Sequence, residues 1–507
     1  MSIAKVYSAQ LIGLEAHIVT IEVDISNGLH AFSVIGLGDR AIDEAKDRIS
    51  AAIKNSGFIS PKQKNQKVVI SLAPADIRKE GPSFDLAMAV GYLSAVGEVE
   101  FDPAGILILG ELSLEGYVRK VNGLLPILCQ ARLRGYSTIF IPDENEKEAS
   151  LAQGVDIYGV TSLREIIEHL QCKRIAKKVE HMKMPREKDI AQLLDMNVIR
   201  GNETAKRGLE IAAAGAHNVL MYGPPGTGKT MLAQSFVSIL PPLSYEQSVE
   251  VTGIHSAARM LKNELITRPP LRSPHHTASY PSIVGGGSFP KPGEITLAHR
   301  GVLFLDELPE FDRSVLDALR QPLEDRKITI SRARGTVTFP AQCILIGAMN
   351  PCPCGKGRDH GCTCLSSVLL AYQRRVSGPI YDRIDISLSV SKVDYQKIMA
   401  EKTTGEDSSA IRERVVRARE RQKNRFTLYG SDKLFNSELG AEDIEKIVHI
   451  DPEARSVLTT SAQKHDLSGR AIHRVIKVAQ TIVDLSGRDC IDVSDILEAL
   501  QYRRKEG

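Results

Sequence analysis

The sequence lacks long hydrophobic runs. It has no stretch of about 18 apolar residues, which excludes an ordinary membrane-spanning helix. Its N-terminus lacks the charged, apolar and cleavage regions of a secretory signal peptide. We therefore expect a cytoplasmic protein with no membrane partner.

The sequence also lacks a large excess of charge of one sign. It has 65 lysine and arginine residues against 62 aspartate and glutamate residues, which gives a net charge of +3. So small a charge does not indicate nucleic-acid binding by the surface as a whole, and such a function must rest on local clusters. The hydrophobic content of 42% and charged content of 25% are typical of a globular protein. Composition alone therefore identifies no partner.

The sequence has few cysteines, and half of them lie in one short segment. Four of the eight cysteines are scattered, whereas Cys352, Cys354, Cys362 and Cys364 lie within 13 residues. In a reducing compartment such a cluster indicates a metal site rather than disulfides. Four thiolates in one loop suit tetrahedral Zn²⁺, although C-x-C pairs are less usual than C-x-x-C. We expect a structural zinc loop over residues 352–364 in preference to a redox switch.

The length of 507 residues is too great for one core and indicates three domains. We expect an α+β domain over residues 1–171, a basic linker over 172–188, a nucleotide-binding α/β domain over 189–392 and a helical lid over 393–507. The linker carries seven lysines and arginines against two glutamates. A solvated connector explains this better than an arm that contacts nucleic acid.

Periodicity predicts the elements of the first domain. Val19, Ile21 and Val23 alternate with polar residues, as in a half-buried strand. Apolar residues at helical spacing predict a helix over 39–55, closed by Gly57. Further strands are expected at 68–72, 106–109 and 138–142, and further helices at 84–96 and 124–134.

One stretch of the second domain fits a phosphate-binding loop. Val219 to Tyr222 is a short apolar strand, Gly223 to Thr230 fits G-x-x-x-x-G-K-[ST], and Met231 to Leu240 can continue as a helix. The glycines let backbone N–H groups surround phosphate oxygens, and the helix N-terminus adds a favourable dipole. Lys229 would contact the β- and γ-phosphates, and Thr230 would bind Mg²⁺. The nucleotide-binding residues expected here are Gly223, Pro224, Pro225, Gly226, Thr227, Gly228, Lys229, Thr230, Met231 and Asp306.

Three later segments complete the expected nucleotide site. The apolar strand Gly301 to Leu305 ends in Asp306, which would orient the water shell of Mg²⁺, and Glu307, which would polarise the attacking water. A second apolar strand ends at Asn350, which would sense the γ-phosphate and hold that water. Arg383 could neutralise charge on the transferring phosphoryl group, but taken alone it would more often form a surface ion pair with Asp382 or Asp385.

Two insertions accompany this site. Residues 327–339 alternate apolar and hydroxyl side chains around Gly335, which predicts a β-hairpin with Arg332 and Arg334 at its tip. Residues 249–292 are rich in Gly, Pro, Ser and His, which predicts a second, looped insertion. Its histidines His275 and His276, like the later His299, lack acidic or cysteine companions at ligand spacing, so we expect structural roles for them.

Periodic patterns also predict the helices of the lid. Ile411 to Arg425 has seven basic residues against two glutamates, and a solvated helix face explains these charges best, with salt bridges between ring subunits next. Leu467 to Leu485 has one apolar face, and Asp492 would cap a last helix over 493–502.

The first domain resembles the proteolytic domain of Lon. Segments 79–83, 109–116, 122–125 and 140–145 carry the resemblance. It implies that Ser83 matches the Lon nucleophile and that Leu125 stands where the partner lysine belongs. A serine without a base beside it is not activated, so we expect a non-proteolytic relative, with a lysine from elsewhere as the open alternative.

The whole chain resembles the bacterial YifB/ComM family of magnesium-chelatase-like AAA+ ATPases. The resemblance rests on the phosphate loop, Arg272-Ser-Pro-His-His276, Leu297 to Glu307, Asn350-Pro-Cys-Pro-Cys-Gly355 and Leu467-Ser-Gly-Arg470. It implies a Lon-like domain, a AAA+ core with hairpin insertions and a helical lid. It also implies a hexameric ring with ATP and Mg²⁺ between subunits, in which Arg383 is the arginine finger and Arg470 the second sensor.

The resemblance further implies a DNA helicase that drives branch migration in natural transformation. In the related MCM and chelatase group, a hairpin before the first sensor points into the ring pore, where Arg332 and Arg334 could hold DNA phosphates without reading sequence. The alternative is a chaperone like magnesium chelatase subunit I that acts on a protein partner. A Lon-type protease is a weaker third hypothesis, against which Leu125 argues.

Overall fold

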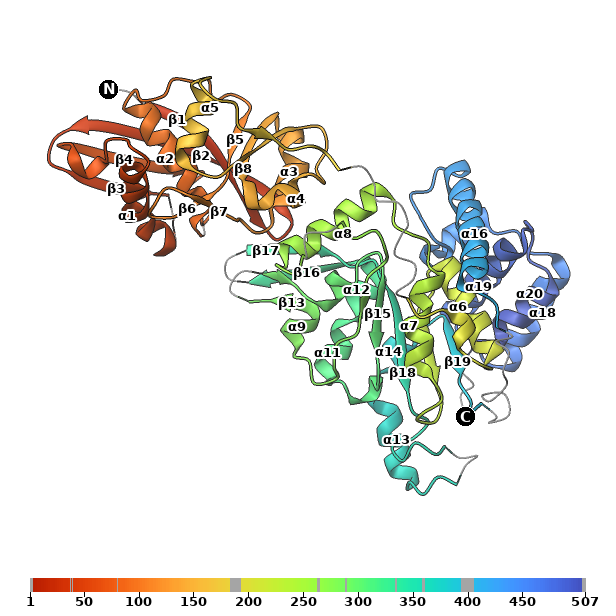
Figure 1. Cartoon of the computed structure of the whole chain (residues 1–507). Coiled ribbons are helices and arrows are strands. Elements are labelled where there is room, and N and C mark those ends of the chain that lie inside the picture. The colour runs from red at the N-terminus through yellow and green to blue at the C-terminus, as the bar shows by residue number, and fades with distance from the viewer. Residues whose placement is uncertain are drawn as a thin grey trace. The chain divides into compact units, whose positions relative to one another are not determined.

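The structure is a computed structural model that describes residues 3–36, 38, 40–79, 81–182, 193–261, 265–287, 290–332, 335–357, 361–393 and 405–503. The chain divides into two compact units (Figure 1). Unit 1 contains Met1–Met184, Tyr245–Ile266 and Phe289–Lys291, and unit 2 contains the rest. The expected three-domain division has its last boundary inside unit 2 and stays a prediction.

Unit 1 has two four-stranded sheets, with strand orders β1-β2-β4-β3 and β10-β9-β8-β5. Antiparallel pairs join β1 to β2 and β2 to β4, whereas β3 runs parallel to β4. The strands are β1 (Ile3–Ile12), β2 (Glu15–Asn27), β3 (Ala31–Ile35), β4 (Gln66–Ala73), β5 (Ile106–Ile108), β8 (Thr138–Pro142), β9 (Asp156–Val160) and β10 (Lys177–Lys178). The short strands β6 (Glu111–Leu112) and β7 (Val118–Arg119) pair with each other.

The helices of unit 1 bury the apolar faces of these sheets. They are α1 (Arg40–Asn55), α2 (Asp85–Ala95), α3 (Leu124–Ala131), α4 (Glu146–Ala149) and α5 (Leu163–Leu170). In α1, Ile42, Ala45, Ile49, Ala52 and Ile53 are buried, as their helical spacing predicts. The strand and helix predictions for this part of the chain are therefore confirmed within a few residues at each end.

Part of the expected linker belongs to the second sheet. Lys177 and Lys178 form β10, which pairs antiparallel with β9. Their ammonium groups lie 2.6 Å from Glu146 and 2.7 Å from Asp156. These two basic residues are thus engaged with neighbouring carboxylates, while residues 183–188 of the expected linker lie outside the described residues.

Helix α8 (Tyr245–Ala257) corrects one prediction, because it begins a segment expected to be looped. Val251 and Ile254 are buried, and α8 packs against α3 within unit 1. The Ser256 hydroxyl donates to the Glu148 carboxylate, which also accepts the Leu125 N–H at 2.9 Å. The pattern was missed because small and polar residues of α8 are buried too, which hides the helical period.

Unit 2 is built on a five-stranded sheet with the order β12-β15-β18-β11-β19. All four neighbouring pairs are parallel. The strands are β11 (Val219–Tyr222), β12 (Leu271–Arg272), β15 (Val302–Leu305), β18 (Ile344–Met349) and β19 (Ile386–Ser389). The mixed α/β class with a parallel sheet is therefore confirmed, and the carboxyl ends of the strands meet at one edge.

Helices surround this sheet, and a hairpin extends from it. The helices of the sheet region are α6 (Glu203–Gly215), α7 (Lys229–Ile239), α9 (Tyr280–Val284), α10 (Glu294–Leu297), α11 (Arg313–Ala318), α12 (Arg320–Asp325), α13 (Ser366–Arg375) and α14 (Gly378–Tyr381). Strands β16 (Lys327–Arg332) and β17 (Gly335–Pro340) form the predicted antiparallel hairpin. The remaining short strands are β13 (Gly285–Gly286) and β14 (Lys291–Pro292).

The C-terminal part is helical, as expected. It contains α16 (Ser408–Leu428), α17 (Ala441–Ile447), α18 (Pro452–Lys464), α19 (Gly469–Ser486) and α20 (Val493–Gln501). Asp492 caps α20 by accepting the N–H groups of Ser494 and Asp495, which confirms the predicted cap. Within the described residues, no helix combines the length and apolarity that a membrane crossing requires.

The basic face of α16 is not the solvated surface that its charge pattern predicted. Arg414 pairs with Glu210 of α6 at 2.5 Å, and Arg421 pairs with Asp489 at 2.5 Å. Arg419 donates to the Ala213 carbonyl at 2.6 Å, and burial lowers its pKa to about 10. These arginines attach α16 to other elements of the same unit because partners distant in sequence face them.

Candidate active site

The predicted phosphate-binding loop connects β11 to α7. Gly226 and Gly228 have φ of +75° and +90°, which L residues rarely adopt, so glycine is needed there for the backbone conformation. At Gly223 the reason is space, because a Cβ would lie 2.0 Å from the Val390 carbonyl oxygen. Helix α7 begins at Lys229, so the lysine and Thr230 stand in its first turn.

Lys229 lies at the centre of this loop. Its ammonium donates to the carbonyl oxygens of Gly223 at 2.8 Å and Pro224 at 2.9 Å, and to Asn350 Oδ1 at 3.2 Å. Burial lowers the pKa of Lys229, while the carboxylates of Asp306 and Glu307 act in the opposite direction. The structure thus brings predicted site residues from the ends of two strands, β11 and β18, into contact with one ammonium group.

The acidic residues after β15 complete this cluster. The Thr230 hydroxyl donates to Asp306 Oδ2 at 2.9 Å, so the hydroxyl and carboxylate expected to serve Mg²⁺ are adjacent. Oxygen donors of this kind are those that Mg²⁺ prefers. Glu307 follows in the left-handed region, with φ of +52°, and its N–H donates to Asp306 Oδ1 at 3.0 Å.

A histidine contacts the carboxylate expected to polarise water. His276 Nδ1 lies 3.3 Å from Glu307 Oε2. The His276 ring also packs against the ring of His275, with centroids 4.1 Å apart. Parallel pairing of β12 with β15 brings His276 to this edge of the sheet. Sequence reasoning assigned His276 a structural role and missed this contact, because the register of β12 was unknown.

Asn350 is fixed by its neighbours as well as by Lys229. Its backbone N–H lies close enough to the Tyr372 phenol of α13 to oppose the rise in the pKa of that group, which burial raises to about 12. Since Asn350 directly follows β18, the sheet and α13 together position it. The amide therefore stands where the strand-end pattern predicts.

The four clustered cysteines lie immediately after Asn350. Their sulfur atoms all lie within 4.8 Å of one another. The Sγ–Sγ distances are 3.2 Å for Cys352–Cys354, 3.6 Å for Cys354–Cys362 and 3.6 Å for Cys362–Cys352. Residues 358–360, at the expected loop tip, lie outside the described residues.

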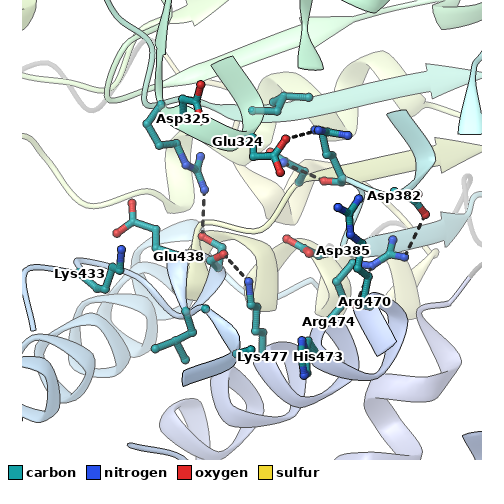
Figure 2. A pocket seen from close by; sticks show the side chains of 18 of the residues that line it. Glu324, Asp325, Asp382, Asp385, Lys433, Glu438, Arg470, His473, Arg474 and Lys477 are labelled. Atoms are coloured by element: carbon teal, nitrogen blue, oxygen red, sulfur yellow. Dashed lines mark hydrogen bonds and ion pairs between the residues drawn. The ribbon is translucent and has the colours of Figure 1, made fainter. Parts of the chain in front are cut away.

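Arg383 and Arg470 line a different part of unit 2. A cavity of about 660 Å³ between the sheet region and α19 contains both arginines together with Arg474 and Lys477 (Figure 2). No residue of the phosphate-binding loop is among the described residues that line it. The structure thus separates the predicted site into two parts. One is the phosphate-loop cluster, which contains residues 223–231, Asp306, Glu307 and Asn350, and the other is the arginine-lined cavity, which contains Arg383 and Arg470.

Acidic groups balance the charges of this cavity. The Arg383 guanidinium contacts Glu324 and donates to the Pro379 carbonyl oxygen at 2.7 Å. The local sequence suggested Asp382 or Asp385 as the ion-pair partner of Arg383. The structure shows Glu324 instead. Arg474 lies 3.6 Å from Asp382. Burial lowers the pKa of Lys477, against the opposing effect of Asp385.

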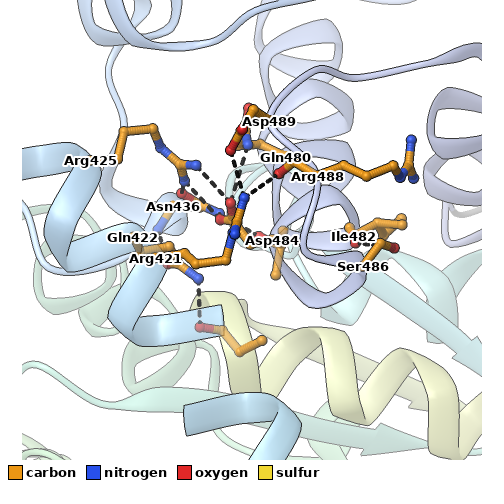
Figure 3. A network of polar contacts seen from close by, with 12 residues as sticks. Arg421, Gln422, Arg425, Asn436, Gln480, Ile482, Asp484, Ser486, Arg488 and Asp489 are labelled. Atoms are coloured by element: carbon orange, nitrogen blue, oxygen red, sulfur yellow. Dashed lines mark hydrogen bonds and ion pairs between the residues drawn. The ribbon is translucent and has the colours of Figure 1, made fainter. Parts of the chain in front are cut away.

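A buried polar network joins helices α16 and α19 (Figure 3). Arg425 donates to both oxygens of Asp484, at 2.6 and 2.7 Å. Asn436 donates to Asp484 at 2.8 Å and to Thr481 at 3.0 Å. His217, which follows α6, contacts Thr481 at 2.8 Å. The network links α16 and α19 to the sheet region. The sequence did not predict it, because its members lie far apart along the chain.

The remaining predicted residues have the following positions. Arg332 ends β16 opposite Gly335, and Arg334 lies outside the described residues. His299 is buried, and its Nδ1 accepts the Gln342 N–H at 3.1 Å, which is consistent with a structural role. The Ser83 hydroxyl has no lysine or histidine hydrogen-bond partner within the described part of the chain, and the Lys79 ammonium donates to the Pro74 carbonyl oxygen instead.

Three family models match the chain. The model described as magnesium chelatase, subunit ChlI, matches residues 195–398. The model described as subunit ChlI of Mg-chelatase matches residues 21–145, and that of the subunit ChlI C-terminal part matches residues 405–503. The first of these ranges contains the whole phosphate-loop cluster and the four cysteines.

Individual relatives align with the chain from end to end. The competence protein ComM of Haemophilus influenzae is 39% identical over 518 residues, which cover 99% of this chain and 98% of its own. The protein YifB of Escherichia coli (strain K12) is 39% identical over 509 residues, covering 99% and 97%. Lon protease 2 of Bacillus subtilis is 33% identical over 99 residues, which are 19% of this chain and 18% of its own.

Proposed function

We propose a function from one premise: this chain belongs to the YifB/ComM family of magnesium-chelatase-like AAA+ ATPases. Membership supports an ATP-hydrolysing motor. We propose more specifically that the chain forms a hexameric ring that moves on DNA as a helicase or branch-migration translocase, in homologous recombination and natural transformation.

The phosphate-loop cluster carries the ATPase part of this proposal. Residues Gly223 to Met231 would hold the phosphates, and Lys229 would contact the β- and γ-phosphates. Thr230 and Asp306, whose side chains are hydrogen-bonded at 2.9 Å, would hold Mg²⁺. When bound, Mg²⁺ neutralises charge on the phosphate oxygens. Glu307 would orient and polarise the attacking water, and Asn350 would hold that water and sense the γ-phosphate.

The arginine-lined cavity supports a ring. Arg383 and Arg470 share a cavity that the described residues of their own phosphate loop do not line. We therefore propose that Arg383 acts on the nucleotide of a neighbouring subunit, where arginine neutralises charge on the transferring phosphoryl group, and that Arg470 is the second sensor. Glu324 would release Arg383 when a neighbour presents a more strongly charged partner.

The β16–β17 hairpin and the similarity to ComM support DNA as the polymer on which the motor moves. ComM, a competence protein, aligns over almost its whole length. Arg332 ends one strand of the hairpin, and Arg334 follows in the sequence. We propose that these arginines hold phosphates without reading bases, which suits single-stranded or branched DNA of any sequence.

Zn²⁺ is the ion that we propose for the four-cysteine centre. Sulfur separations of 3.2 to 3.6 Å are far too long for a disulfide bond of about 2.05 Å. They approach the edge of about 3.8 Å of a tetrahedron with Zn–S bonds of 2.3 Å. We expect about one Zn²⁺ per chain by elemental analysis, lost when Cys352 and Cys362 are changed to serine together. Reduced protein without metal and with four freely titrating thiols in this loop would contradict the assignment.

A magnesium-chelatase-like chaperone is the second candidate. The matching family models all bear the description of magnesium chelatase subunit ChlI. Such a motor would use the same ATP site but remodel a protein partner or drive metal insertion. The two candidates therefore differ in what stimulates ATP hydrolysis: DNA for the helicase, and a protein partner for the chaperone.

A salt titration of the hairpin variant separates the candidates. Changing Arg332 and Arg334 to alanine should weaken DNA binding about equally for all sequences. It should also reduce the slope of log K against log salt by about 1 for each lost phosphate contact. Basal ATP hydrolysis should survive, because neither arginine belongs to the phosphate-loop cluster. Binding and salt dependence equal to those of the parent would reject the hairpin assignment, and a parent without DNA affinity would favour the chaperone.

A further inference from the structure

The four-cysteine centre lies directly against the phosphate-binding loop. A Cβ built on Gly355, which directly follows Cys354, would lie 2.8 Å from Pro225 Cδ and 3.0 Å from Pro225 Cγ. Such an approach is possible only because Gly355 has no side chain. The backbone of the cysteine loop therefore packs on the proline ring of the phosphate-binding loop.

A second connection runs through Asn350. This residue precedes Cys352 by two positions, and its Oδ1 accepts a hydrogen bond from the Lys229 ammonium at 3.2 Å. On the far side of the cysteine loop, the Tyr372 phenol lies close to the Asn350 backbone N–H, which opposes the rise that burial causes in the pKa of that phenol. The cysteine loop thus begins next to Asn350, which contacts Lys229, and it leads into α13, whose Tyr372 lies beside Asn350.

The cysteine loop owes its shape to contacts with sulfur as well as backbone. The Gly357 N–H donates to Cys352 Sγ at 3.2 Å, and the Cys364 N–H donates to Cys362 Sγ at 3.4 Å. Gly355 and Gly357 both have φ of +76°, which turns the chain around the sulfur atoms. Without an ion, four thiol groups in contact have no strong attraction that would keep this short loop closed.

We propose that the cysteine centre is a metal-held brace for the phosphate-binding loop, so that Zn²⁺ occupancy sets the affinity for ATP. This proposal rests on the proposed ATP and Zn²⁺ sites. With Zn²⁺ bound, the loop holds Pro225 and Asn350 in place before nucleotide arrives. Without Zn²⁺, part of the binding energy must order these groups, which weakens the observed affinity for ATP.

The brace acts on binding more than on the chemical step, because bound nucleotide itself orders Pro225 and Asn350 once the site is filled. Asp306 and Glu307 follow β15, and no hydrogen bond or ion pair joins them to the cysteine loop among the described residues. Removal of Zn²⁺ should therefore weaken ATP binding roughly tenfold, with a much smaller change in turnover at saturating ATP. An ion that only stabilised the fold would move both quantities together with the melting temperature.

The decisive comparison uses two glycine variants of the full-length protein. Gly355→Ala retains all four cysteines but directs a methyl group at Pro225. Gly361→Ala is the matched control, because Gly361 has nearly the same backbone strain, with φ of +71°, and no atom of the described residues within 4 Å of its Cβ position. Both variants should bind about one Zn²⁺. Only Gly355→Ala should weaken binding of a fluorescent ATP analogue, by roughly tenfold.

The same titration on parent protein completes the test. Zn²⁺-loaded protein should bind the analogue about tenfold more tightly than chelator-treated protein, and added Zn²⁺ should restore the affinity. Equal affinity of the loaded and stripped forms, or of the two glycine variants, would overturn the brace. Absence of bound Zn²⁺ from the parent would overturn it as well. Failure of loaded parent to bind the analogue at all would instead reject the proposed ATP site, for which Lys229→Ala is the reference.

Discussion

Replacing Arg383 with alanine should suppress ATP hydrolysis far more than it lowers stability. In the structure, its guanidinium contacts Glu324, whose side chain is 59% exposed, and two backbone carbonyl oxygens at 2.7 and 3.2 Å. A surface ion pair contributes about 0–1 kcal/mol, and each hydrogen bond adds about 0.5–1.5 kcal/mol. The expected loss of folding free energy is therefore about 1–4 kcal/mol.

The expected loss of catalysis is larger. An arginine that serves the transferring phosphoryl group accelerates hydrolysis by about 10³- to 10⁵-fold, which corresponds to about 4–7 kcal/mol. ATP binding by a single subunit should remain nearly intact, because the cavity that holds Arg383 is not lined by the described residues of its own phosphate loop. A defect confined to turnover would therefore identify Arg383 as a residue that acts on a neighbour.

Three measurements test this prediction: ATP turnover, binding of a fluorescent ATP analogue and thermal unfolding. Arg313→Ala is a suitable control, because the Arg313 side chain is 84% exposed and lies outside the cavity. Mixing Arg383→Ala with Lys229→Ala subunits should restore some hydrolysis at mixed interfaces. The reasoning would be refuted if turnover fell less than about tenfold, or if single subunits lost ATP binding and no mixture regained turnover.

Two further predictions concern the phosphate-loop cluster and the buried network. Lys229→Ala should abolish nucleotide binding, whereas Glu307→Gln should retain ATP but hydrolyse it slowly, because only the water-polarising group is lost; equal, near-normal turnover of both variants would reject these roles. Arg425→Met should lower the free energy of unfolding by about 3–5 kcal/mol, because it leaves the fully buried Asp484 carboxylate without its cation. Arg421→Met, whose partner carboxylate is 93% exposed, should cost no more than about 1 kcal/mol. Denaturant unfolding of the two variants measures this difference, and equal losses would contradict it.

The sequence predicted the local parts of the fold because their patterns are short. The strand before Gly223, the carboxylates after Leu305 and the cysteine cluster each lie within a few consecutive residues. Strand ends of a parallel sheet meet at one edge, so strand assignment placed Lys229 and Asn350 at the same edge of the sheet, without giving their contact.

The parts that were missed depend on contacts between distant segments. Helix α8 could not be recognised because its buried polar residues obtain their partners from unit 1, as Ser256 does from Glu148. The contact of His276 with Glu307 depends on the pairing of β12 with β15. The ion pair of Arg383 with Glu324 likewise joins residues 59 positions apart, and no local pattern predicts such a partner.

The contact between Gly355 and Pro225 has the same origin. Sequence reasoning recognised both loops separately, one by its glycines and lysine and the other by its cysteines. Only the adjacency of β11 and β18 in the sheet brings them together. A functional link between the two loops therefore becomes visible only in three dimensions.

Strand displacement on forked DNA tests the central claim most directly. Purified protein with ATP and Mg²⁺ should separate forked or branched DNA of unrelated sequences, and ATP hydrolysis should rise when the DNA is added. Glu307→Gln should bind the same DNA without separating it, because it holds ATP but does not hydrolyse it at a useful rate. An active ATPase that neither separates the strands nor responds to single-stranded, double-stranded or branched DNA would contradict the assignment of DNA as the track.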